Sequence, residues 1–176
     1  MTAHRLLVIA RRFRGPPTSG NRGYTCGMLA AAAPKPVEVR FVRPPPLDRR
    51  LEIVDDPATG GLKLVDGVDT IATATPKSFE LDVPRPPSYA QALAAVGNYE
   101  GFQEHAYSNC FVCGPLLGTY AARIDRCVHL DASCVVIGWA LKHEGRKHVV
   151  GTAIFDHSGE LCGRALATWV EPRPAA

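Results

Sequence analysis

Short runs of apolar residues recur along the chain, and in some of them apolar and polar residues alternate with the period of half-buried β-strands. The clearest example is 37–43, where valine and phenylalanine alternate with charged residues. Two further runs, 62–65 and 70–75, flank Asp66-Gly67, a dipeptide favoured in tight hairpin turns. Strands are also predicted over 4–10, 51–54, 119–124, 134–141, 147–155 and 161–170. The pattern therefore predicts a mainly antiparallel β protein.

One segment, 19–33, is built of small and apolar residues and predicts a helix. Thr18 or Ser19 is expected to cap its first turn, because each side chain offers an oxygen to an unpaired backbone N–H. Pro34 and Pro36 end the helix. A helix that is apolar on all sides is expected to be buried. Strands that follow one buried helix favour an α+β fold in which a sheet wraps around that helix.

A proline-rich segment divides the chain. Residues 83–87 resemble a stiff linker, and Ser88 is expected to cap a short helix that reaches Val96. We therefore predict a first unit over 1–84, a linker with a short helix over 85–101, and a second unit over 102–176. The strands of the second unit follow one another without a second glycine-rich helix.

Composition narrows the classes of function. At 176 residues and 46% hydrophobic content the chain is long enough to bury a core. A net charge of +3, with both signs interspersed, argues against a nucleic-acid surface. Apolar runs are too short to span a bilayer, and six irregularly spaced cysteines fit reduced thiols. We therefore expect no nucleic-acid or membrane partner and a cytoplasmic location.

A glycine-rich turn leads into the predicted helix, with Gly20, Gly23 and Gly27 close together. Bare N–H groups at a helix N-terminus suit an anion or a polarised carbonyl oxygen. The alternative is that the glycines only let the helix pack closely against a sheet. Asn21 also has two interpretations, either a polar group that orients substrate or water, or a helix cap.

Three features of the sequence carry a resemblance to a known superfamily. They are Gly20-Asn21-Arg22-Gly23-Tyr24 before the helix, the closing hairpin over 145–169 with its turn Asp156-His157-Ser158-Gly159, and Asn109-Cys110-Phe111-Val112-Cys113-Gly114-Pro115. In this order they resemble the hotdog-fold thioesterase-like superfamily, and the last one resembles a double-hotdog acyl-CoA thioesterase-like branch. The resemblance implies an antiparallel sheet wrapped around a central helix, as a double hotdog. Its second unit is incomplete, because the chain goes almost directly from Pro115 to the later strands; either this unit is degenerate or a segment has been lost.

The resemblance also implies a chemistry. The protein would hydrolyse or bind acyl thioesters such as acyl-CoA, with the carbonyl polarised by backbone N–H groups at the helix N-terminus. The implied catalytic residues are Asn21, Gly23 and Tyr24, and the implied substrate-binding residues are Gly20, Arg146 and Lys147. Arginine and lysine suit the phosphates of coenzyme A, which is part of the substrate. No separate cofactor and no metal is expected, and a homodimer is implied.

One expected group is missing, because 18–33 contain no acidic residue that could activate water. The alternative function is therefore a non-catalytic acyl-CoA-binding or structural protein that has lost its catalytic carboxylate. Glu104 and His105 could form an acid–base pair or be exposed loop residues. Cys110 and Cys113 fit structural cysteines, half of a zinc site, or a redox pair.

Overall fold

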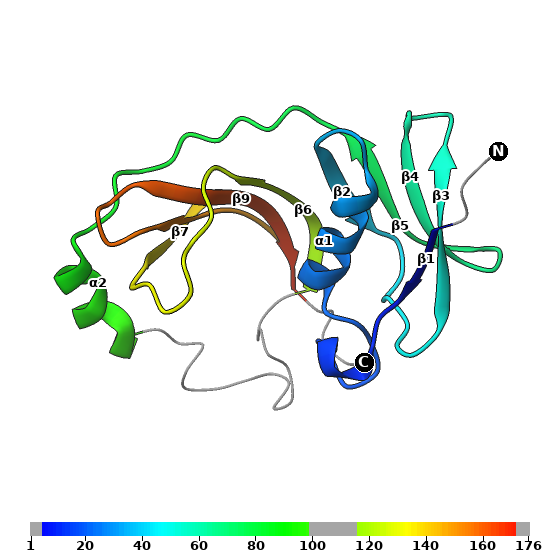
Figure 1. Cartoon of the computed structure of the whole chain (residues 1–176), viewed down its shortest axis with the longest axis horizontal. Helices are drawn as coiled ribbons and strands as arrows, with labels where there is room; N and C mark the ends of the chain where they lie inside the picture. Colours follow the sequence, from blue (N-terminus) through cyan, green and yellow to red (C-terminus); the bar gives the residue numbers. More distant parts are fainter. Residues whose placement is uncertain (1–4, 99–115, 172–176) are drawn as a thin grey trace.

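The computed structural model of the chain describes residues 5–98 and 116–171 (Figure 1). Within these residues, nine strands form one antiparallel sheet in the order β1-β3-β4-β5-β2-β6-β9-β8-β7. The predicted fold class, an antiparallel sheet with one central helix, is confirmed. The strands are β1 (Arg5–Val8), β2 (Val37–Phe41), β3 (Arg50–Asp56), β4 (Gly61–Asp66), β5 (Asp69–Pro76), β6 (Leu116–Ile124), β7 (Val135–Glu144), β8 (Lys147–Phe155) and β9 (Leu161–Val170).

The central helix begins later than the sequence suggested. It is α1 (Arg22–Ala32), and its cap is Asn21, so the expected cap at Thr18 or Ser19 is wrong. The Gly15 N–H donates to the Ser19 carbonyl at 3.0 Å, which folds this segment into a turn of its own before the helix starts. A single 3-10 turn, η1 (Arg11–Phe13), precedes it.

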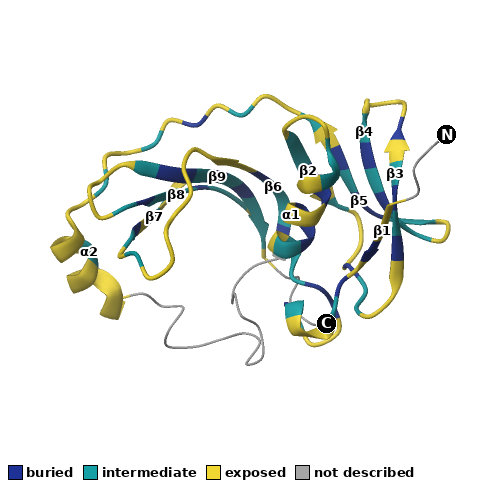
Figure 2. Ribbon diagram, viewed as in Figure 1, coloured by how far each residue is buried: buried dark blue, intermediate teal, exposed yellow. Residues whose placement is uncertain are grey.

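The linker carries the predicted short helix. It is α2 (Tyr89–Ala95), capped by the Ser88 side chain and followed by the 3-10 turn η2 (Val96–Asn98). All residues of α2 are at least partly exposed, in contrast to α1 (Figure 2). Among the described helices, none has the length and apolar character needed to cross a bilayer.

The main core lies between α1 and the strands that it covers. Leu29 and Cys26 on α1 are buried together with Val39 of β2. Two fully buried alanines of β5, Ala72 and Ala74, belong to the same cluster. Their small side chains let the helix pack close to the sheet. Burial of one leucine side chain such as Leu29 contributes about 1.5–3 kcal/mol. This packing fixes which face of the sheet α1 occupies.

The sheet consists of two similar halves that meet between β2 and β6. Toward the junction, the strand order in the first half is β3-β4-β5-β2. Toward the same junction from the opposite edge, the strand order in the second half is β7-β8-β9-β6. The halves pair through Val39 opposite Tyr120 and Arg40 opposite Thr119. The sheet therefore runs without interruption from the predicted first unit into the predicted second unit, and the unit boundaries themselves stay a prediction.

Segment 77–88 crosses the second half from β5 to α2 (Figure 1). Its Val83 packs with Ala92 of α2 against a small buried cluster on β7 and β8 that includes Val135 and Phe155. Trp139 lies directly over Gly151 on the neighbouring strand, where a side chain on residue 151 would overlap the indole ring. One face of the second half is thus covered by the linker and α2.

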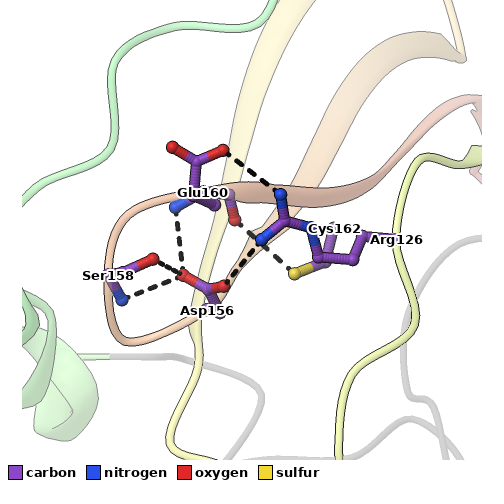
Figure 3. A network of polar contacts seen from close by, with 5 residues as sticks. All are labelled: Arg126, Asp156, Ser158, Glu160 and Cys162. Atoms are coloured by element: carbon purple, nitrogen blue, oxygen red, sulfur yellow. Dashed lines mark hydrogen bonds and ion pairs between the residues drawn. The ribbon is translucent and has the colours of Figure 1, made fainter.

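The turn between β8 and β9 is held by one carboxylate (Figure 3). Asp156 accepts hydrogen bonds from the Ser158 hydroxyl at 2.6 Å, the Ser158 N–H at 2.9 Å and the Glu160 N–H at 3.0 Å. The Ser158 hydroxyl is the main cause of a lowered pKa of Asp156. Gly159 completes the turn with φ of +85°.

Replacing Gly159 with alanine is expected to lower the free energy of unfolding by about 1–2 kcal/mol, because an L side chain is strained in left-handed backbone. Gly159→Asn is expected to lose less, since asparagine tolerates positive φ better. Urea unfolding followed by circular dichroism measures both variants. Equal stability of Gly159→Ala and the wild-type protein would contradict this account of the turn.

Candidate functional site

The first turn of α1 is organised by Asn21. Its side-chain oxygen accepts the Tyr24 N–H at 2.9 Å, and its backbone carbonyl accepts the Thr25 N–H at 3.0 Å. Asn21 is therefore the helix cap, one of the two interpretations of this residue. As placed, the Tyr24 N–H already has an acceptor and is not free to polarise a carbonyl.

Two backbone donors remain at this helix end. The N–H groups of Arg22 and Gly23 have no hydrogen-bond acceptor among the described residues, as expected for the first turn of a helix. Gly23 is exposed, and a side chain on it would approach only the Asn21 oxygen, at 3.2 Å. The positive end of the helix dipole lies at the same place. The two N–H groups at this end of α1 can therefore donate hydrogen bonds to a partly negative oxygen that approaches from solvent.

Gly20 differs from Gly23 in its surroundings. It is buried, its N–H donates to the Pro45 carbonyl at 2.8 Å, and a Cβ on it would lie 2.9 Å from Ile9 Cγ2. The missing side chain at Gly20 thus permits close packing against Ile9. At Gly27, by contrast, a Cβ would meet no atom within 4 Å.

The Arg22 side chain ties α1 to the second half of the sheet. Its guanidinium donates to the Leu117 carbonyl on β6 and lies over the Phe41 ring at 5.1 Å. Partial burial lowers the pKa of Arg22, but an arginine stays charged at neutral pH. A fixed positive charge therefore lies where α1 meets β2 and β6.

Cys26 lies one helical turn after Arg22 and is 3% exposed. Burial raises the pKa of its thiol to about 12, so the thiol stays neutral at physiological pH. Burial also raises the pKa of Tyr120 on the adjacent strand. Neither group is therefore prepared to act as a nucleophile or base, and Cys26 behaves as a small apolar core residue.

A histidine and a carboxylate that sequence reasoning missed form a pair at the start of β8. His148 Nε2 lies 2.7 Å from Glu171 Oε1, and the His148 ring stacks on His143 with 4.4 Å between centroids. His148 pairs with Trp169 in the sheet, and Trp169 pairs with Leu117. Two strand spacings, roughly 10 Å, thus separate His148 from the strand residue that Arg22 contacts.

The predicted phosphate-binding residues lie at this same end of the sheet. Lys147 pairs with Val170, which pairs with Leu116 beside Leu117. Arg146 donates to the Glu171 carbonyl at 2.5 Å, and both basic residues are exposed. The structure therefore brings Arg146 and Lys147 to the end of the second half where α1 begins. The sequence alone does not reveal this placement, because both residues are far from Arg22 along the chain.

Several sequence candidates lie elsewhere. Glu104, His105, Cys110 and Cys113 fall outside the described residues. Another acidic residue of the second half, Asp125, forms ion pairs at 2.9 Å with Arg123 and 3.2 Å with Arg164. Within 5–98 and 116–171, no three His, Cys, Asp or Glu side chains gather in a way that could hold a metal ion.

Solved structures match almost the whole chain. A proposed thioesterase from Novosphingobium aromaticivorans is 10% identical, with 97% of this chain and 96% of that chain covered and a TM-score of 0.62. A proposed thioesterase II from Thermobifida fusca is 12% identical over 97% and 92%, with a TM-score of 0.63. A conserved protein with a hot dog fold from Alicyclobacillus acidocaldarius is 12% identical over 98% and 93%, with a TM-score of 0.56.

The chain adopts the hotdog fold. At these identities the likeness shows the fold alone. Neither a protein-family model nor a curated protein sequence matches the chain. In this hotdog sheet, Arg22 and Gly23 lie beside the junction of β2 and β6, and Arg146, Lys147 and His148 lie at the same end of the sheet two strands away.

Cys26 is expected to resist alkylation by iodoacetamide at pH 8 in the folded protein, while the exposed Cys127 reacts. The raised pKa keeps Cys26 neutral until about pH 12, and only the thiolate attacks the reagent. The raised thiol pKa also makes the free energy of unfolding depend on pH. Its contribution is fully present below the pKa of the thiol in the unfolded chain, and it is lost as pH rises through the pKa of the thiol in the folded protein. Peptide mass spectrometry separates the two sites, and equal labelling rates would contradict the burial of Cys26.

Proposed function

We propose that this protein binds acyl thioesters such as acyl-CoA and hydrolyses them. The observation that carries the proposal is the pair of unpartnered N–H groups on Arg22 and Gly23, at an exposed helix N-terminus capped by Asn21. Donors of this kind stabilise the oxyanion that develops on an attacked carbonyl. The shared fold of two proposed thioesterases supports the same reaction class.

In the proposed reaction, a water oxygen attacks the thioester carbon and its proton passes to a general base. The tetrahedral oxyanion is held by the Arg22 and Gly23 N–H groups, and the adjacent guanidinium adds positive potential. The carbon–sulfur bond then breaks, and the leaving thiol regains the proton. Among the described residues His148 suits the base, because Glu171 orients its ring.

Arg146 and Lys147 are proposed to contact the phosphates of coenzyme A, which is part of the substrate. Both are exposed and lie at the end of the sheet where α1 begins. A cytoplasmic location completes the proposal, supported by the free thiols among the described cysteines. Coenzyme A thioesters are made and used where such thiols stay reduced.

The central experiment compares thiol release by Arg22→Pro and Arg22→Ala on a panel of acyl-CoA substrates. Proline fits the first helical position, and Asn21 before it is already extended, with ψ of 124°. Arg22→Pro removes one backbone donor together with the side chain, whereas Arg22→Ala removes the side chain only. Loss of one oxyanion donor is expected to lower kcat by a further roughly 100- to 1000-fold in Arg22→Pro.

Equal kcat for the two variants would contradict carbonyl binding at this helix end. A second candidate, a non-catalytic acyl-CoA-binding protein, is favoured by the missing carboxylate on α1. It predicts that acyl-CoA raises the melting temperature of the wild-type protein while no thiol is released. Absence of both release and stabilisation would exclude both functions.

Arg146→Ala and Lys147→Ala are each expected to raise KM for acyl-CoA by about tenfold, because each removes a charged donor to phosphate. For an acyl thioester of N-acetylcysteamine, which lacks phosphates, KM is expected to change much less. Steady-state thiol release with both substrates measures the difference. Equal KM effects on the two substrates would argue against phosphate contacts.

A further inference from the structure

Basic residues are concentrated in the part of the chain that leads into α1. Residues 1–50 hold ten of the 20 lysines and arginines, but two of the 17 aspartates and glutamates. Among these basic residues, Arg11 and Arg12 lie in η1 and Arg14 follows it directly, and this segment leads to the start of α1 (Figure 1). The surface before α1 therefore carries an excess of positive charge, which attracts anions.

Arg12 is held next to the first turn of α1 by a stack of side chains. Its guanidinium carbon lies over the Phe13 ring, 4.7 Å from the ring centroid. Phe13 in turn stacks on Tyr24, with 4.0 Å between the ring centroids and an interplanar angle of 9°. The Phe13 carbonyl also accepts the Asn21 N–H at 2.8 Å. Because the stack restricts the arginine, less conformational entropy is lost when its N–H groups bind a ligand.

Arg14 lies close to the same helix end. It forms an isolated antiparallel bridge with Gly20, two residues before α1. Arg11 is neutralised, because it pairs with Asp48 at 3.2 Å. The guanidinium groups of Arg12 and Arg14 have no hydrogen bond and no ion pair among the described residues. Two cations this close in the chain repel each other, so an anion bound to both would offset the repulsion.

The other basic group at this end of the sheet, Arg146 with Lys147, has acidic neighbours. Arg146 already donates to the Glu171 carbonyl at 2.5 Å, and the Glu171 carboxylate lies beside the same hairpin, 2.7 Å from His148. Glu144 ends the preceding strand, β7. Positive charge is therefore balanced more fully in this hairpin than in the segment before α1.

Coenzyme A carries phosphate in two places, a diphosphate within its chain and a phosphate monoester on the 3′ position of its ribose. A phosphate monoester carries about −1.5 to −2 charges at pH 7, which is more than either phosphate of the diphosphate carries. Arginine presents a fork of N–H donors that matches two oxygens of such a group. The more negative monoester therefore suits the segment with the larger excess of positive charge.

We propose that Arg12 and Arg14 bind the 3′-phosphate of coenzyme A, while Arg146 and Lys147 take the diphosphate. The inference rests on the proposed function, because it names the carrier that brings the acyl group to the start of α1. It makes the protein selective for coenzyme A over carriers that lack the monoester, such as 3′-dephospho-coenzyme A and pantetheine.

Isothermal titration calorimetry with coenzyme A and 3′-dephospho-coenzyme A tests the proposal without turnover. The wild-type protein is expected to bind coenzyme A roughly 100-fold more tightly, because two charged donors meet the monoester. Arg12→Ala and Arg14→Ala are each expected to reduce this preference to about tenfold. Arg12→Glu is expected to remove or reverse it, since a carboxylate repels the monoester.

Arg40→Ala is the matched control. Arg40 is an exposed arginine on β2, and it follows Val39, whose side chain is buried in the core that α1 covers. Because side chains alternate along a strand, Arg40 points to the opposite side of the sheet. Its removal changes the net charge equally and is expected to keep the full preference for coenzyme A. Melting temperatures check that each variant folds.

Three results would overturn the proposal. Equal affinity of the wild-type protein for the two ligands, or binding of neither, would mean that no site for the 3′-phosphate exists. A preference that survives in Arg12→Ala and Arg14→Ala but falls in Arg146→Ala would place the monoester in the hairpin. An equal loss in Arg40→Ala would mean that net charge alone causes the preference.

Thiol release, measured alongside, separates this inference from the proposed function. Release of thiol from acyl-coenzyme A and its 3′-dephospho form at equal kcat/KM would contradict the 3′-phosphate site and leave hydrolysis standing. A calorimetric preference for coenzyme A without thiol release from any acyl thioester would support the site and contradict hydrolysis.

Discussion

The structure depends on one constraint: the sheet has two apolar halves, but α1 is the one described helix with buried residues. Leu29 and Cys26 anchor α1 to the first half through Val39, and Arg22 ties its start to Leu117 on the second half. The first half is thereby closed into a core. The second half has the same strand order, but among the described residues its matching face keeps Ile124 and Val136 exposed.

The helix that closes the core also creates the candidate site. Its first turn leaves the Arg22 and Gly23 N–H groups without an acceptor among the described residues. The next donor, the Tyr24 N–H, is not available to a substrate, because it donates to the Asn21 side chain. Because the chain continues from α1 into β2, and β2 pairs with β6, these donors lie beside the second half of the sheet. The basic residues Arg146 and Lys147 reach that region through strand pairing alone.

Local patterns predicted much of this fold. Alternation located the strands, the capping serine located α2, and Asp156 with Gly159 marked the last turn. The start of α1 was missed, because the pairing of Gly15 with Ser19 that delays it is not visible in helix propensity. The His148–Glu171 pair was missed as well, because it exists only once β8 and β9 take their register.

The most direct test of the central claim is the amide spectrum of the protein with two acyl-CoA analogues that resist hydrolysis. One analogue replaces the thioester sulfur with a methylene and keeps the carbonyl, and the other is a thioether without a carbonyl. Binding at the start of α1 predicts that the ¹⁵N–¹H signals of Arg22 and Gly23 move downfield with the ketone and much less with the thioether, because only the ketone accepts their hydrogen bonds. Equal shifts with both analogues, or none at these two amides, would contradict the account.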